Sequence, residues 1–349
     1  MSKILVLGRT MDMGGTEVAM AALLQKLVEK KEDVTLLLVE KRGVLLERIP
    51  KEVEVRQMIW DKKPHPALER ETPAERSFYA RGMGVFLMRV VYGKKRYGKL
   101  YERILECVEP ETKQYDLVFD FFGFGAFTTA FGARKTNARK KAVWFHGENL
   151  WWLFRTRDFI PEYDKIYCVS EPVRKQVIAR FPELADRTEV LLNFIDIKQV
   201  QRRSEEPLSD PQYTGELKFL TVGRASEEKG YDIAVQITAE LKKRGLCFKW
   251  FIIGDGRDLN KLRTMAKEYQ VEQEIIFLGM RENPAPYVKS CDLYLQPSRH
   301  EGYPITIVEA RSLQKVIIAS DIPSMREQIR DGENGYLCPL DVMQFADKI

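Results

Sequence analysis

Residues 298–309 read Ser-Arg-His-Glu-Gly-Tyr-Pro-Ile-Thr-Ile-Val-Glu, and this stretch predicts a turn that opens a helix. Pro304 suits the first helical position, because the N–H that proline lacks would be unpaired there. A helix from this point places Ile305 and Leu313 on the face of Glu309. A carboxylate in such an apolar stripe is costly to bury unless it is hydrogen-bonded. Glu309 is therefore either a buried carboxylate satisfied by a distant side chain or part of a binding site.

The start of this predicted helix also suits an anion. Gly302–Ile305 offers unpaired backbone N–H groups at the positive end of the helix dipole, which favours a ligand such as a diphosphate. A nucleotide diphosphate laid along the helix would bring its ribose hydroxyls near Glu309. Glu301, on the turn, would face whatever is attached beyond the phosphates.

Short apolar runs alternate with helical patterns from end to end of the 349 residues. Uniformly apolar short strands between amphipathic helices are typical of parallel sheets covered on both faces. Two such series predict two doubly wound domains, residues 1–200 and 201–349, with Gln201–Gly215 as the linker. The predicted strands are Ile4–Leu7, Val34–Val39, Leu117–Phe119, Ala142–Phe145, Ile166–Val169, Val190–Leu192, Phe219–Val222, Phe248–Ile253, Ile275–Leu278, Leu293–Leu295 and Val316–Ala319.

The positive charge gathers in the first half of the chain. Residues 1–200 hold 35 Lys and Arg against 28 Asp and Glu, whereas residues 201–349 hold 21 against 23. Residues 76–103 alone hold eight basic residues and one acid, interleaved with aromatic side chains. This segment is either an ordinary helix with a basic exposed face or a surface for anionic lipid headgroups or a phosphate-bearing acceptor. The residues that would form such a surface are Arg89, Lys94, Lys95 and Arg96. Nucleic acid is a weaker option, since no nucleic-acid-binding module accompanies the basic segment.

Other signals exclude several classes of protein. The five cysteines are scattered and form no close pair, which argues against a disulfide framework or a zinc site and for a reducing compartment. No pattern of His and carboxylates resembles a metal site, so no metal is expected. The apolar run Leu117–Ala133 carries Asp120 and three glycines, which favours a strand, turn and helix over a membrane span. Without a signal peptide, the protein is expected to be soluble and cytoplasmic.

Ligands of doubly wound sheets bind where strands end and loops lead into helices. In the loop Gly223–Gly230, Arg224 and Lys229 could neutralise a diphosphate, one as a planar fork and the other as a point charge. The alternative is a solvated loop in which these cations pair with Glu227 or Glu228.

Two loops of the first half carry weaker signals. Gly14-Gly15 lets the backbone approach a ligand before the first helix, although it matches neither a dinucleotide fingerprint nor a phosphate-binding loop with Lys and Ser/Thr. A plain glycine-rich turn is an equal alternative. His146 ends a predicted strand, where it is either structural or directed at a ligand.

Taken together, these loops resemble those of the retaining family 4 glycosyltransferases of the GT-B fold, in which two Rossmann-like domains face a cleft. The resemblance covers most of the chain and is strongest over Leu217–Leu340. It rests on the order of its elements: Gly14-Gly15, His146-Gly147, Gly223-Arg224 with Lys229-Gly230, Gly254-Asp-Gly256, Glu301 with Glu309 eight positions later, Ser320–Glu327 and Asp331–Gly335.

The resemblance implies roles for these residues. Arg224 and Lys229 would hold the diphosphate of a nucleotide sugar and stabilise it as leaving group. Glu309 would bind the ribose and Glu301 the donor sugar, while His146 would contact that sugar near the reacting carbon. The remaining donor-site residues are Gly15, Gly223 and Gly254 beside the phosphates, Gly302, Tyr303 and Pro304 at the helix start (although Pro304 has no N–H), and the backbone at Met280 and Arg281, which would read the base.

We therefore expect a metal-independent glycosyltransferase without a cofactor. Its second domain would bind a nucleotide sugar, with UDP preferred over GDP, and its first domain a lipid-linked or polysaccharide acceptor of a cell envelope, with the protein peripheral at the inner membrane face. The C-terminal helix that crosses back in this fold is expected to be missing, because the chain stops at Ile349. The alternatives are a sugar-nucleotide epimerase of the same fold and a non-catalytic sugar-nucleotide-binding subunit.

Overall fold

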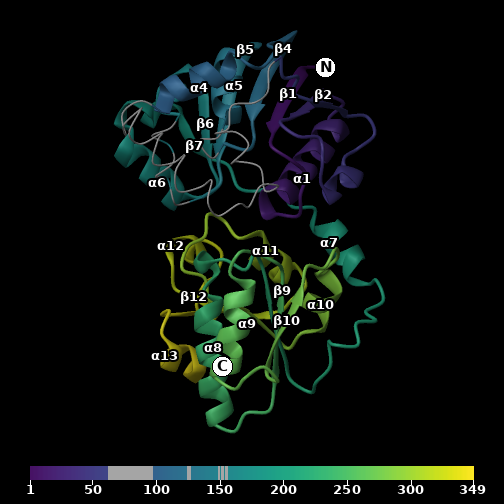
Figure 1. The fold of residues 1–349 in the computed structure, drawn as a ribbon, viewed down its shortest axis with the longest axis vertical. Helices are drawn as coiled ribbons and strands as arrows, with labels where there is room; N and C mark the ends of the chain where they lie inside the picture. The colour runs from purple at the N-terminus through teal and green to yellow at the C-terminus, as the bar shows by residue number, and fades with distance from the viewer. Residues whose placement is uncertain (62–96, 124–126, 148–149, 151–152, 154–155) are drawn as a thin grey trace. The chain divides into compact units, whose positions relative to one another are not determined.

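The computed structural model describes residues 1–61, 97–123, 127–147, 150, 153 and 156–349. The chain forms two compact units, Met1–Leu192 and Asn193–Ile349, each of which is described by itself (Figure 1). The boundary lies between Leu192 and Asn193, rather than after residue 200 as the sequence predicts.

The first unit contains a parallel sheet with the strand order β3-β2-β1-β4-β5-β6-β7. Its strands are β1 (Lys3–Gly8), β2 (Asp33–Leu38), β3 (Glu54–Gln57), β4 (Glu111–Asp120), β5 (Thr136–Phe145), β6 (Lys165–Cys168) and β7 (Thr188–Val190). Its helices include α1 (Gly15–Glu29), α4 (Tyr97–Leu105), α5 (Phe127–Arg134) and α6 (Glu171–Arg180), with short 3-10 turns η1 (Val44–Arg48), η3 (Ile160–Glu162) and η4 (Pro182–Arg187). Each predicted strand of this half has a counterpart, although β7 lies two residues earlier than predicted and shares only Val190 with the prediction, and β3 is an additional strand.

The second unit contains a parallel sheet with the order β10-β9-β8-β11-β12-β13. Its strands are β8 (Lys218–Val222), β9 (Lys249–Ile253), β10 (Ile275–Gly279), β11 (Leu293–Gln296), β12 (Val316–Ser320) and β13 (Tyr336–Cys338). Its helices are α7 (Ile197–Ser204), α8 (Tyr231–Lys243), α9 (Leu259–Glu268), α10 (Ala285–Ser290), α11 (Ile305–Ser312), α12 (Pro323–Arg326) and α13 (Val342–Lys348), with the 3-10 turn η5 (Glu227–Lys229).

Both faces of this second sheet are covered, because successive strand residues point to opposite sides. Trp250 and Ile252 of β9 pack into one apolar core with α8, α9 and α13. Their neighbours Phe251 and Ile253 pack into another core with α10, α11 and α12. The fold is therefore the predicted α/β class with doubly wound parallel sheets.

The predicted linker is partly helical. Gln201–Ser204 forms the last turn of α7, which belongs to the second unit. Proline and acidic residues did indicate irregular chain beyond it, since residues 205–217 contain no helix or strand. Amino-acid composition predicts that a segment is irregular, but it does not predict which of the two units the segment belongs to.

Asp120, at the carboxyl end of β4, is completely buried and carries a prediction about pH. Burial raises its pKa to about 6, although hydrogen bonds from Thr129 and the Gly123 amide oppose the rise. The native state therefore keeps a proton between about pH 4 and 6 that the unfolded chain has lost. We expect the free energy of unfolding to fall by up to about 3 kcal/mol as pH rises through this window.

Urea unfolding of the wild type and of Asp120→Asn at several values between pH 4 and 7 measures this contribution. The amide does not titrate, so the difference between the unfolding free energies of the two proteins should change between pH 4 and 6. A difference in unfolding free energy that stays constant from pH 4 to 7 would refute the raised pKa of Asp120.

Candidate functional site

The loop after β8 and the loop after β11 meet at the carboxyl edge of the second sheet. The strand order reverses between these adjacent strands, which is where doubly wound sheets bind ligands. Gly230 has a φ of 66°, and a Cβ there would lie 1.8 Å from the Pro297 carbonyl oxygen. Only glycine therefore lets the two loops approach this closely.

Lys229 and Glu301 form an ion pair at this meeting point. Lys229 Nζ donates to Glu301 Oε1 at 2.6 Å and to Oε2 at 2.7 Å. The two side chains are 20% and 7% exposed. The structure thus joins two predicted site residues and contradicts the alternative that Lys229 pairs with a glutamate of its own loop.

A buried polar row holds the Glu301 carboxylate from the other side. Ser298 Oγ donates to Glu301 Oε1 at 2.7 Å, and Gln296 Nε2 donates to the same oxygen at 3.1 Å. Tyr294 Oη donates to Gln296 Oε1 at 3.2 Å. All three supporting side chains are completely buried. The sequence analysis missed Gln296 and Ser298, although a polar residue at the end of an apolar strand and another two positions later were a signal available in the sequence.

Arg299 fastens the same two loops together. Its guanidinium donates to both carboxylate oxygens of Asp232 at 2.7 and 2.6 Å, and its backbone N–H donates to the Glu228 carbonyl at 2.7 Å. These contacts fix the relative position of Lys229 and Glu301 through the backbone.

Arg224 lies in the same loop, but its side chain is exposed and has no hydrogen bond or ion pair in the described part of the chain. Gly223 makes room for its neighbours, because a Cβ there would lie 2.9 Å from Tyr231 Oη and 3.5 Å from Lys229 Cε. Gly254, at a φ of 140°, is constrained by the backbone, since its Cβ would lie 1.9 Å from the Gly223 carbonyl oxygen. Loop packing thus accounts for both glycines, and contact with phosphate stays a prediction.

Helix α11 begins at Ile305, with Pro304 as its N-cap, so the predicted start is one residue early. Its first N–H groups have no partner within the helix. Gly302 and Tyr303 lead into it and are half-buried, and burial raises the pKa of the Tyr303 hydroxyl. Glu309 is half-buried rather than fully enclosed, and its charge adds to the burial that raises the pKa of Tyr294.

The loop after β10 holds the two residues predicted to read a base. Met280 is 52% exposed. The Arg281 side chain turns back to Asp210, whose Oδ2 accepts from its Nη2 at 2.7 Å. The Arg281 side chain is therefore occupied by Asp210, whereas Met280 is accessible, and contact of this loop with a base stays a prediction.

Two predicted residues lie in the first unit. Gly15 is the first residue of α1, and Gly14 precedes it in extended conformation, so the glycine pair does form a turn from strand to helix. His146 Nε2 lies 2.7 Å from the Phe121 carbonyl oxygen, and since a carbonyl only accepts, this nitrogen carries the proton. The ring also packs on Phe121 and Trp144 at centroid distances of 4.9 and 5.0 Å. His146 is thus at least a structural anchor, and its contact with a sugar stays a prediction.

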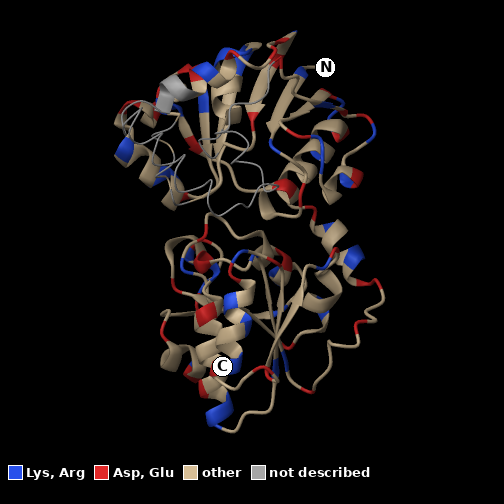
Figure 2. Cartoon of the chain, viewed as in Figure 1, with Lys and Arg blue, Asp and Glu red and all other residues tan. Residues whose placement is uncertain are grey.

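The predicted basic surface of Arg89, Lys94, Lys95 and Arg96 lies outside the described residues. On the described helices of both units, basic and acidic residues occur side by side (Figure 2). In the described ranges, no helix is long and apolar enough to span a bilayer. The same ranges contain no group of three or more His, Cys, Asp or Glu side chains placed to hold a metal ion.

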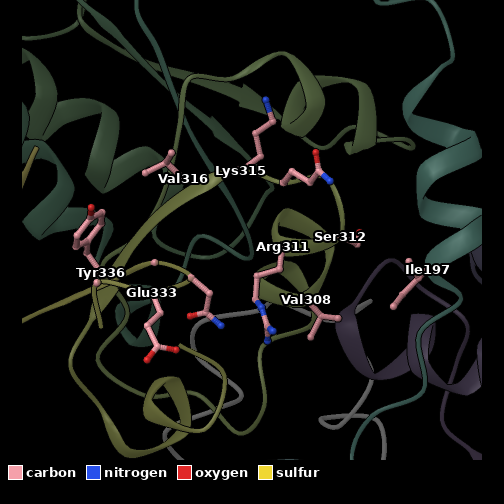
Figure 3. Close-up of a pocket in the computed structure, with 12 residues that line it drawn as sticks. Ile197, Val308, Arg311, Ser312, Lys315, Val316, Glu333 and Tyr336 are labelled. Atoms are coloured by element: carbon pink, nitrogen blue, oxygen red, sulfur yellow. The ribbon is translucent and has the colours of Figure 1, made fainter. Parts of the chain in front are cut away.

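A hollow of about 630 Å³ lies elsewhere on the second unit, between α11 and β13. Figure 3 shows Arg311 and Val308 on one side of it and Val316 and Tyr336 on the other. It contains none of the predicted donor-site residues. The candidate site is therefore the edge at Lys229 and Glu301, where polar groups converge.

The second unit is also similar to known proteins. Residues 203–349 match the family model described as "Glycosyl transferases group 1". Through these residues, the second unit of the chain is similar to the group 1 glycosyl transferases. The matched range contains Lys229, Glu301 and the buried row that supports them. The resemblance to GT-B glycosyltransferases drawn from the motifs is thereby confirmed.

Two curated relatives and one solved structure illustrate the similarity. An uncharacterized glycosyltransferase of Methanocaldococcus jannaschii is 29% identical over 54% of this chain and 45% of its own length. An N-acetylgalactosamine-N,N'-diacetylbacillosaminyl-diphospho-undecaprenol 4-alpha-N-acetylgalactosaminyltransferase of Campylobacter jejuni is 26% identical over 52% of this chain and 48% of its own length. The chain thus aligns with about half the length of these relatives.

The structure of Anabaena HepE in complex with UDP matches with a TM-score of 0.66 at 18% identity, covering 99% of this chain and 88% of that one. At this identity the match shows the fold, which is GT-B.

Proposed function

We propose that this protein is a glycosyltransferase that moves a sugar from a nucleotide diphosphate sugar to an acceptor. The observation that carries the proposal is the position of Lys229. Lys229 lies in the loop after β8, and its ammonium is held by Glu301 of the loop that leads from β11 into α11. A diphosphate at this edge would meet one fixed cation, one exposed cation at Arg224 and the first amides of a helix.

This arrangement suits the departure of a diphosphate. When the bond from the anomeric carbon to the phosphate oxygen breaks, the electron pair stays on the diphosphate, and Lys229, Arg224 and the helix start oppose the new charge. The acceptor hydroxyl forms the new bond to carbon, and its proton passes to the departing phosphate. We infer that the acceptor attacks from the side of departure, so that configuration is retained. Because protein cations carry the charge, we also infer that no metal ion is required.

The ion pair adds a condition to this proposal. Glu301 is predicted to bind hydroxyls of the donor sugar, yet Oε1 already accepts three hydrogen bonds. Oε2 accepts from Lys229 alone among the described residues and is the atom available to a sugar hydroxyl. Lys229 must then share its protons between this carboxylate and the diphosphate. As an ammonium it has three donors, which is enough for both.

The relatives support the donor and acceptor classes that we propose. UDP is the proposed nucleotide, because the HepE structure of the same fold holds UDP. A lipid-linked or polysaccharide acceptor is proposed, because the name of the Campylobacter relative includes a diphospho-undecaprenol carrier. Such an acceptor would place the protein in the cytoplasm at the inner face of the membrane.

A panel of UDP- and GDP-sugars, tested with and without a lipid-linked glycan acceptor and with and without EDTA, checks the proposal. We expect nucleotide release with at least one UDP-sugar, accelerated by acceptor and insensitive to EDTA. Nuclear magnetic resonance of the product should show the anomeric configuration of the donor.

Three outcomes would contradict parts of this proposal. Conversion of the sugar nucleotide without acceptor would indicate an epimerase. Binding of sugar nucleotides without any product, across the whole panel, would indicate a non-catalytic subunit. Loss of activity in EDTA would refute metal independence.

A further inference from the structure

Asp210 holds the loop that follows β10. Its Oδ2 accepts hydrogen bonds from Arg281 Nε at 3.0 Å, from Arg281 Nη2 at 2.7 Å and from Tyr287 Oη at 2.8 Å. The side chains of Asp210 and Arg281 are 10% and 27% exposed. A carboxylate with this many donors fixes the guanidinium in one plane.

The other side of that guanidinium holds the backbone of its own loop. Arg281 Nη1 donates to the carbonyls of Leu278 and Met280. Between them, Gly279 has a φ of 73°, and its carbonyl accepts from the Gly254 amide at 2.9 Å. Arg281 therefore joins Asp210 to the carbonyl groups of the two residues on either side of Gly279.

Asp210 is itself held in place by the core. Tyr213, three residues later, packs on Phe251 at a ring distance of 4.4 Å, and its Oη donates to the Tyr287 carbonyl at 2.9 Å. Burial alone would raise the pKa of Asp210, but hydrogen bonds from Arg281, the Gln212 amide and Tyr287 outweigh it and hold this pKa below the usual value. The carboxylate is thus a charged and anchored partner at neutral pH.

We propose that Asp210 is a positioning residue for the nucleotide base. By fixing Arg281, it holds the peptide groups of Leu278–Arg281 in the conformation that contacts the base, so this contact needs no reordering when nucleotide binds. The inference rests on the proposed function, since it needs a nucleotide against this loop.

Calorimetric titration of UDP, CDP, GDP and ADP into the wild type and into Asp210→Asn tests the proposal. The amide keeps the shape of the side chain but loses the charge that orders Arg281. We expect the affinity for the preferred nucleotide to fall about tenfold, which is about 1.4 kcal/mol. The other nucleotides should lose less, so that the preference among bases shrinks.

Two further variants separate positioning from general damage. Glu205→Gln alters an exposed pair with Lys289 in the same segment and should leave every affinity unchanged. Tyr287→Phe removes a single donor to Asp210 and should shrink the base preference in the same direction but less, which keeps the test available if Asp210→Asn does not fold.

The outcomes distinguish this inference from the function on which it rests. A wild type that binds none of the four nucleotides overturns the proposed function, and the inference falls with it. A wild type that binds one base best, together with variants that keep that preference or lose all four affinities equally, overturns the inference alone.

Discussion

Replacement of Lys229 by alanine is expected to abolish sugar transfer and also to lower the free energy of unfolding by about 3 kcal/mol. The second effect arises because the Glu301 carboxylate would stay buried without its cation, at a side-chain exposure of 7%. Lys289→Ala is the matched control, since Lys289 pairs with Glu205 on the surface, where both side chains are largely exposed. Lys289→Ala should lower the free energy of unfolding by less than about 1 kcal/mol.

A double variant separates stability from chemistry. Lys229→Met with Glu301→Gln removes both charges and replaces the stem of the lysine with a side chain of similar length. We expect it to recover part of the lost stability and none of the activity, as measured by urea unfolding and nucleotide release. An unfolding free energy of Lys229→Ala equal to that of the wild type would show that the pair does not form in solution. Wild-type turnover in Lys229→Ala would remove the leaving-group role.

Replacement of Gly254 by alanine is expected to destabilise the second unit by more than about 4 kcal/mol. The new Cβ would lie 1.9 Å from a backbone oxygen of Gly223, and backbone cannot rotate out of the way as a side chain can. The collision moves the loop that carries Lys229, so nucleotide binding should fall with stability.

Gly245→Ala is the control for this effect. It shares a positive φ of 81° but has no atom within 4 Å of the added carbon. It should therefore cost only about 1–2 kcal/mol of backbone strain. Equal unfolding free energies for the two variants, measured by urea denaturation, would contradict the close approach of the backbone at Gly254 to the backbone at Gly223.

The strands that the sequence predicts are those with an uninterrupted apolar run. β3 (Glu54–Gln57) and β13 (Tyr336–Cys338) escaped prediction because both lie at sheet edges, where short and partly exposed strands need no such run. β4 and β5 are longer than predicted for a similar reason, since their first residues are polar and mostly exposed.

The site shows a comparable limit. Motif spacing identified Lys229 and Glu301 separately, but these residues are 72 positions apart and meet only because β8 and β11 are neighbours in the sheet. The sequence of neither loop indicates which strands are neighbours in the sheet. The support from Gln296 and Ser298 and the clamp on Arg281 likewise depend on which elements the fold brings together.

The central claim is that the diphosphate of a nucleotide sugar binds at Lys229 beside the start of α11. A crystal structure of the full chain with UDP tests it most directly. We predict diphosphate oxygens within hydrogen-bond distance of Lys229 Nζ and of the first amides of α11, with the ribose hydroxyls at Glu309. Nucleotide bound away from these groups, for example in the hollow between α11 and β13, would contradict the account.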